Sequence, residues 1–278
     1  MEGPSLYLAA EQLRPLKGET VVDVAGNTKT DKERLRGRIV RDIFAWGKHL
    51  VFQFDTFAVR IHFMLFGTFE AEVDGVWVTG DYRRAREPRL ALVFTRGRIL
   101  MFSCSVKFIE SPSARRMYDF SVDIMSRSWD PGQAVRNLRR AADEQIADVL
   151  LDQEVFAGVG NIIKNEVLSL TRTHPQQRIR SLNAAKLKEI TARTREFSKQ
   201  FLRWRRKFLL RKNLKVHRRA ACPHCAGKLL RKKTGERERW SYWCPRCQPL
   251  RRATVVKPAA KKQRSPSRKR SQIPNLRN

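Results

Sequence analysis

The sequence predicts a multidomain α+β chain. An N-terminal antiparallel β-sandwich with an N-terminal helix is followed by a helical domain and a C-terminal four-cysteine zinc ribbon. Three observations support this class. Residues 20–110 are rich in β-forming residues, apolar residues recur at helical spacing from 131 to 210, and two Cys-x-x-Cys pairs lie within 222–247. At about 150 residues per domain, 278 residues suggest two domains and a small appendage.

The domain limits follow these changes of pattern. We expect the β-sandwich at 1–115, a linker at 116–131, the helical domain at 132–215, the zinc ribbon at 216–250 and a tail at 251–278. The tail has ten lysines or arginines and no acidic residue. It is therefore predicted to be disordered and to add non-specific affinity for a polyanion.

The N-terminal part opens with a predicted helix at 4–16. Pro4 suits a first helical turn, and apolar residues recur at helical spacing at Leu6, Ala9, Leu13 and Leu16. Predicted strands follow at 20–24, 50–54, 59–63, 90–94 and 99–102, with 95–98 as a hairpin turn. Strands in direct succession favour an antiparallel sandwich.

The helical part follows a segment at 111–131 that contains Ser, Pro and Gly. The predicted helices are one from Pro131 with Val135, Leu138 and Ala142 on a face, one marked by Ile146, Val149 and Leu150, one at 161–170, and a long one at 184–210 after Ser181 or Asn183 as N-cap.

The charge balance indicates a polyanionic partner. Lys and Arg number 58 against 27 acidic residues, a net charge of +31. Neutralised phosphates release counterions and add salt-sensitive affinity, so a nucleic acid is favoured over an anionic membrane surface. The alternative is a ribosome-bound or otherwise generic basic protein.

Nothing in the sequence indicates a membrane segment. It holds no apolar stretch of about 18 residues, and Met1-Glu2-Gly3-Pro4 lacks the features of a signal peptide. We expect a cytoplasmic, nucleoid-associated protein without a membrane partner. Five cysteines in such a protein favour a metal site or reduced thiols over disulfides.

The cysteine module predicts a structural zinc ion. Cys222, Cys225, Cys244 and Cys247 form two Cys-x-x-Cys turns separated by 18 residues, which suits four thiolates on one tetrahedral ion. The alternative, a redox pair, is disfavoured because two pairs are present and neither lies in a βαβ pattern. Cys104 is expected to be a buried, inert thiol, and His224 is expected to point away from the ion.

Two further segments offer contacts for phosphate. Arg237-Glu238-Arg239-Trp240-Ser241-Tyr242-Trp243 lies between the cysteine pairs and can place an arginine on a phosphate, or form a solvated ribbon face. The Gly158-Val159-Gly160-Asn161 turn precedes a helix whose free N–H groups suit an anion. The alternative for this turn is a tight corner between two helices.

Four separated signatures resemble the formamidopyrimidine-DNA glycosylase/endonuclease VIII family. Glu2-Gly3-Pro4 is similar to the family's N-terminal Pro-Glu-Gly-Pro, and Gly47-Lys48 follows a strand as the family's catalytic-domain lysine does. The stretch 152–161, followed by Glu166, resembles the helix-two-turn-helix motif. Arg239-x-Ser241-x-x-Cys244-x-x-Cys247-Gln248 resembles the zinc ribbon, with Ser241 where the family usually has Thr. The resemblance covers about residues 1–248.

The resemblance implies a base-excision-repair DNA glycosylase with abasic-site lyase activity on double-stranded DNA. The family's N-terminal α-amine attacks C1′ of the damaged nucleotide, the base leaves, and a Schiff base precedes β- and δ-elimination. Glu2 would then be the acid/base for opening the sugar ring, and Lys48 would hold a phosphate beside the lesion. Gly160, Asn161 and Arg239 would hold the DNA backbone.

The resemblance also assigns an apolar wedge. The damaged base must leave the stack, and Met64-Leu65-Phe66 align with the residues that fill the resulting void. The alternative is that these three residues belong to the core.

The chain departs from the family at its start, where the usual proline is missing and Met1 directly precedes Glu2. We predict that the α-amine of Met1 is the nucleophile, because a primary amine forms the same Schiff base. The alternatives are a damage- or abasic-site-binding protein that has lost full glycosylase action, and a misassigned start codon. The short connection at 211–221 resembles endonuclease VIII, which implies oxidised pyrimidines, and a monomer is expected.

Overall fold

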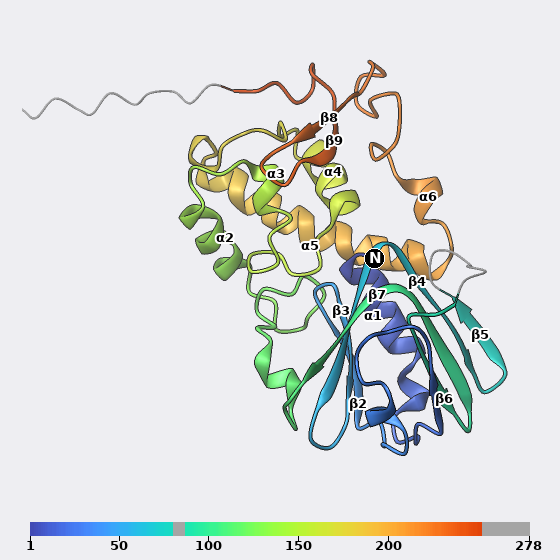
Figure 1. Ribbon diagram of the computed structural model, residues 1–278. Coiled ribbons are helices and arrows are strands. Elements are labelled where there is room, and N and C mark those ends of the chain that lie inside the picture. The colour runs from blue at the N-terminus through green and yellow to red at the C-terminus, as the bar shows by residue number, and fades with distance from the viewer. Residues whose placement is uncertain (80–86, 252–278) are drawn as a thin grey trace, which may run out of the picture.

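The computed structural model describes residues 1–79 and 87–251 (Figure 1). Its parts are an antiparallel sheet with helix α1 (Gly3–Gln12), a group of helices, and a two-stranded ribbon. This arrangement confirms the predicted α+β class and the order of its parts. The predicted disordered tail lies outside the described residues, apart from Arg251. Within the described ranges, no helix is long and apolar enough to cross a bilayer.

The sheet is antiparallel at every pairing and follows the order β1-β6-β7-β4-β3-β2, with β5 on β4. Its strands are β1 (Asp23–Ala25), β2 (Asp42–Trp46), β3 (His49–Gln53), β4 (Ala58–Val73), β5 (Val76–Thr79), β6 (Leu90–Phe94) and β7 (Gly97–Ile109). Backbone hydrogen bonds also join the segments 18–21 and 37–40, which precede the two outer strands β1 and β2. The outer ends of the sheet therefore approach each other, as a sandwich requires.

Strands β4 and β7 are longer than the predicted strands at 59–63 and 99–102. They pair from Ala58↔Ile109 to Val73↔Gly97, with a register shift between Phe63 and Thr68. The apolar triplet 64–66 lies at this shift and interrupts the alternation of buried and exposed residues, so the sequence pattern ends there. The short strands β2 and β5 were not predicted.

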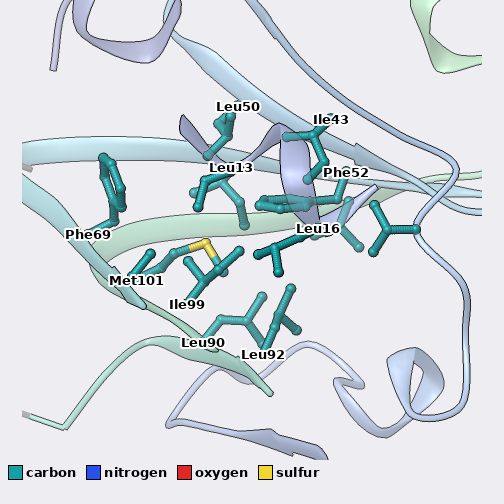
Figure 2. Close-up of a cluster of buried hydrophobic side chains, with 14 of the residues drawn as sticks. Leu13, Leu16, Ile43, Leu50, Phe52, Phe69, Leu90, Leu92, Ile99 and Met101 are labelled. Carbon is teal, nitrogen blue, oxygen red and sulfur yellow. The ribbon is translucent and has the colours of Figure 1, made fainter. Parts of the chain in front are cut away.

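The core of the N-terminal part lies between α1 and the sheet (Figure 2). The helix predicted at 4–16 ends at Gln12 and is followed by a 3₁₀ turn at Arg14–Leu16, but all four residues of the predicted face are buried: Leu6, Ala9, Leu13 and Leu16. Side chains from both halves of the sheet join them, among them Leu50, Phe52, Phe69, Leu92 and Met101. This packing holds α1, and with it the first residues of the chain, against the sheet.

The helical part contains the four predicted helices in order and one short helix that was not predicted, at Leu210–Asn213; the first helix ends at Arg140, before the predicted Ala142. Its members are α2 (Pro131–Arg140), α3 (Ile146–Val149), α4 (Asn161–Leu170), α5 (Ala184–Arg206) and α6 (Leu210–Asn213). Of the two candidate caps for α5, Asn183 is the one observed, since its side chain accepts a hydrogen bond from Lys186 N at 2.8 Å. The helix ends before the predicted 210 because Phe208 has a φ of 58°, which no α-helix continues.

The predicted linker at 116–131 is packed against the helices. Ile124 belongs to the helical core, and Ile124 N donates to Ala157 O at 3.0 Å. The ribbon consists of β8 (Leu230–Thr234) and β9 (Arg239–Trp243). It lies beside α4 at the top of the view in Figure 1.

Candidate active site and phosphate clamp

Three backbone segments that are distant in sequence meet where the sheet joins the helices. Gly3 N donates to Gly158 O at 2.8 Å, and Gly47 N donates to Asp123 Oδ2 at 3.0 Å. A Cβ on Gly3 would lie 2.7 Å from the Cα of Gly158, so only glycine permits this approach. The contact places the first residues, the turn before Lys48 and the turn before α4 in one site. Figure 1 shows the N-terminus at this junction.

The Glu2 carboxylate covers the N-terminal end of α4. It accepts hydrogen bonds from Ile162 N at 2.7 Å and from Gly160 N and Ile163 N at 3.2 Å. Free N–H groups at a helix N-terminus favour a negative charge. Burial nevertheless raises the pKa of Glu2, while Lys48, these N–H groups and the amino terminus lower it. Glu2 is therefore a carboxyl group able to hold a proton above the usual pH range.

The amine of Met1 and the ammonium of Lys48 act on this carboxylate, and His62 lies near both of these cations. Met1 is half-buried and packs against the sheet core, and the positive charge of its amine affects both Glu2 and His62. Burial lowers the pKa of Lys48, with Glu2 opposing this shift and Arg239 adding to it. Burial also lowers the pKa of His62. Glu2 and Lys48, each with a pKa shifted by burial, thus share the site with the amine of Met1.

The opposite side of the site is a contact between α4 and β9, which we call the clamp; it comprises Asn161, Lys164, Asn165, Arg239 and Trp240. The backbone carbonyl of Trp240 accepts hydrogen bonds from Asn161 Nδ2 at 2.9 Å, Lys164 Nζ at 3.3 Å and Asn165 Nδ2 at 3.3 Å. These bonds hold the residue after Arg239 against α4, and the exposed Arg239 lies close enough for its charge to act on Lys48 and Lys164. The geometry thus brings Gly160, Asn161 and Arg239 together.

The hairpin of the ribbon is held by a second helix. Asp148 of α3 accepts hydrogen bonds from Glu236 N at 3.0 Å and Arg237 N at 3.3 Å. A Cβ on Gly235 would lie 2.1 Å from a carboxylate oxygen of Asp148. The ribbon is therefore fixed at its turn by α3 and along β9 by α4.

The predicted wedge is exposed at the register shift of β4. The exposed fractions are 54% for Met64, 72% for Leu65 and 50% for Phe66. This exposure excludes the alternative that the triplet belongs to the core. Three adjacent exposed apolar residues are unusual on a water-facing surface and indicate a contact site.

The four predicted zinc ligands form one cluster. The Sγ atoms of Cys222, Cys225, Cys244 and Cys247 all lie within 4.8 Å of one another, and thiolates at such separations suit a tetrahedral zinc ion. His224 is not part of the cluster, because its Nε2 lies 3.2 Å from the carbonyl oxygen of Ser169. Cys104 is buried, as expected, and burial raises its pKa to about 12.

Comparison with known proteins supports the same relationship. Residues 122–205 match the family model described as the formamidopyrimidine-DNA glycosylase H2TH domain. Mouse Endonuclease 8-like 3 is 32% identical over 216 residues, which cover 76% of this chain and 35% of that protein. Endonuclease 8 2 of Mycobacterium bovis is 27% identical over 228 residues, 77% of this chain and 85% of that protein. The chain belongs to the formamidopyrimidine-DNA glycosylase/endonuclease VIII family.

Solved structures show the same fold. A viral DNA glycosylase has a TM-score of 0.75 at 20% identity, covering 89% of this chain and 100% of its own. Lactococcus lactis formamidopyrimidine-DNA glycosylase, bound non-covalently to DNA with an AP site, has a TM-score of 0.76 at 19% identity, covering 90% and 100%. The chain nevertheless spans only about a third of the length of the Endonuclease 8-like 3 proteins that it matches.

Several residues of the site have no distinctive sequence pattern. Asp123 lies in the predicted linker, yet it is buried and holds Gly47, and burial raises its pKa to about 6. Lys164 and Asp148 hold the ribbon, but Lys and Asp are residue types that usually lie on a helix surface. A charged residue at a position where the helical periodicity predicts burial is the signal that could have found Lys164.

Proposed function

We propose that this family member is a base-excision-repair DNA glycosylase and abasic-site lyase whose nucleophile is the α-amine of Met1. One observation carries the proposal. The Glu2 carboxyl group, with a raised pKa, lies on the N-terminus of α4 beside the amine of residue 1 and Lys48. A protein that only bound DNA would gain nothing from this costly arrangement.

The chemistry needs an amine and a proton donor. The neutral amine attacks C1′, the bond from C1′ to the base breaks, and the base leaves with the bonding electrons and takes up a proton. Glu2 gives its proton to the ring oxygen as the sugar opens, and the nitrogen forms an iminium with C1′. Loss of a C2′ proton then expels the 3′ phosphate and nicks the strand. An α-amine has an unperturbed pKa of about 7.7–8.0, so part of it is neutral near pH 7.

Double-stranded DNA with a damaged base or an abasic site is the proposed partner of the monomer. Asn161 and Arg239 would contact backbone phosphates from α4 and the ribbon, and Lys48 would contact a phosphate at the lesion. The Met64-Leu65-Phe66 triplet would fill the gap left by the extruded nucleotide. The short connection between α5 and the ribbon favours oxidised pyrimidines as the preferred bases.

The metal of the ribbon is proposed to be one Zn²⁺. Cys222, Cys225, Cys244 and Cys247 would hold it, and their mutual separations fit the thiolate cage that zinc prefers. With four protein ligands the ion has no open position for a substrate. Its role would be to stabilise the fold of the ribbon that carries Arg239.

Borohydride trapping tests the proposal. The protein, with its mature N-terminus established by intact mass, is incubated with a duplex containing one abasic site and reduced with borohydride. We expect a covalent adduct that peptide mapping places on the α-amine of Met1. Addition of one residue before Met1 displaces the amine and should abolish the adduct. A zinc-loaded protein that binds the site without forming an adduct would overturn the enzyme proposal and favour a damage-binding protein.

A further inference from the structure

We propose that Lys164 is a positioning residue of the clamp: it fixes the backbone of Trp240 and Ser241 so that Arg239 faces the first turn of α4. The inference rests on the proposed function, because it specifies how the ribbon is aligned for a DNA phosphate. The signature motifs do not include this residue.

The Lys164 ammonium spans the contact between helix and ribbon. Nζ lies 2.8 Å from Ser241 Oγ and 3.3 Å from Trp240 O. Ser241 Oγ also shares a hydrogen bond of 2.6 Å with Thr234 Oγ1 on β8. Lys164 therefore connects α4 to both strands of the ribbon, at the two residues that follow Arg239.

The burial of this lysine is unusual. Lys164 is 0% exposed and is the one fully buried lysine among the residues that the structure describes. Burying an ammonium group is strongly unfavourable unless hydrogen bonds and opposite charges compensate. An apolar residue at position 164 could pack against the ribbon without that cost. The buried charge therefore indicates a role in alignment.

The groups whose charges act on Lys164 lie on α3, on β9 and at the start of the chain. Burial lowers its pKa to about 7; Asp148 of α3 and Glu2 oppose the shift, and Arg239 of β9 adds to it. His217 also faces it, but burial lowers the pKa of His217 to about 4, so that ring stays neutral near pH 7. A phosphate bound between Asn161 and Arg239 would add a negative charge nearby and favour the protonated lysine. Affinity for DNA should therefore fall as the pH rises through 7.

The test compares Lys164→Met with the wild type and with Lys186→Met as matched control. Methionine keeps the volume and removes the charge and the donors. Lys186 lies on α5 and bonds to Thr171 O and Glu189, away from the clamp.

We measure the dissociation constant for a duplex with an uncleavable abasic-site analogue, and the trapping rate at saturating abasic DNA. Lys164→Met should weaken binding about tenfold, the loss of one charged hydrogen-bonding group, with little change in the saturated rate; Lys186→Met should change neither.

A double-mutant cycle separates alignment from general stability. If Lys164 acts through Arg239, Lys164→Met should have no further effect in an Arg239→Ala background. The decline in wild-type affinity between pH 6 and pH 8 should also become flatter in Lys164→Met. Additive effects of the two substitutions, or an unchanged pH profile, would overturn the proposal.

Two controls keep these outcomes clear. Zinc content and thermal unfolding establish that Lys164→Met is folded; if it is not, Ser241→Ala removes one lysine contact and should weaken binding about two- to threefold through the same cycle. Unchanged binding by Ser241→Ala would then count against the proposal.

Failure of the proposed function is distinguishable, because it appears as no trapping by the wild type while the binding measurements remain valid. A wild type without affinity for the duplex would overturn both.

Discussion

The two sides of the site differ in how far water reaches their charged groups. On the catalytic side, burial raises the pKa of Glu2 and lowers that of Lys48. On the clamp side, Arg239 is exposed at the end of β9. Proton transfer needs groups whose pKa lies near the working pH, whereas phosphate binding needs donors that are always charged and accessible. Burial of Glu2 and exposure of Arg239 thus suit the two tasks, while the buried Lys164 of the clamp positions the ribbon and is not itself the phosphate donor.

The first turn of α4 belongs to both sides. Its backbone N–H groups bind Glu2, and its Asn161 side chain binds the ribbon. The helix therefore aligns the reacting groups with the DNA backbone that it is proposed to hold. Substitutions on one side should change the rate of chemistry, and those on the other should change affinity.

The largest effect is expected for Glu2→Gln on the catalytic side. The amide cannot deliver the proton, so the single-turnover trapping rate should fall by roughly 10²- to 10⁴-fold. Affinity for an uncleavable abasic duplex should stay within about twofold, since no clamp residue is changed. In the wild type, the rate should fall as the pH rises through the raised pKa of Glu2, because the required proton is lost; Glu2→Gln should lack that alkaline decline.

Glu11→Gln is the matched control for this substitution. Glu11 lies on α1, which Glu2 directly precedes; it is exposed and pairs with Arg206, so its effect should be small. A Glu2→Gln rate close to that of the wild type would show that the carboxyl group has only a structural role. Loss of affinity in Glu2→Gln would show that the two sides are not separable.

The sequence predicted the catalytic side less completely than the metal site. The four cysteines could be placed from spacing alone, because thiolates in two tight turns have one common way to converge. The positions of Glu2 and Lys48 came from a resemblance, and no periodicity brings residue 2 to residue 162. That contact depends on Gly3, Gly47 and Gly158 approaching one another, a tertiary feature that local pattern does not encode.

The fold shows the same limit. Helices α2 and α4 begin at the predicted residues because Asp130 and Gly160 precede them as caps or turns. Strand β4 was predicted too short because the exposed apolar triplet interrupts its pattern. A residue kept apolar and exposed for a contact resembles a core residue in the sequence, so the proposed wedge was also the place where the strand prediction failed.

A smaller effect is expected from loss of the metal on the clamp side. The ribbon core contains few buried apolar residues, and two strands alone are marginally stable, so Cys244→Ser should unfold the ribbon. Affinity for the abasic duplex should fall on the order of 10- to 100-fold, about 1.4–2.8 kcal/mol, with a smaller change in the saturated trapping rate. Metal content by mass spectrometry and binding by fluorescence anisotropy measure this. Cys104→Ala, outside the cluster, should retain the metal; equal losses in both variants would contradict the assignment.

The smallest effect is expected from the wedge, which lies outside both sides. Leu65 is the most exposed of the three residues, so Leu65→Ala removes apolar surface with little cost to the fold. Duplex with an abasic site should bind about three- to tenfold more weakly, because less of the gap in the stack is filled. A single strand with the same abasic site has no partner base left unstacked, and its binding should not change.

Val76→Ala, which truncates another exposed apolar residue, is the control for Leu65→Ala. An equal loss on both DNA forms would mean that Leu65 contacts the backbone and belongs functionally to the clamp, so the division by exposure would have to be extended to β4.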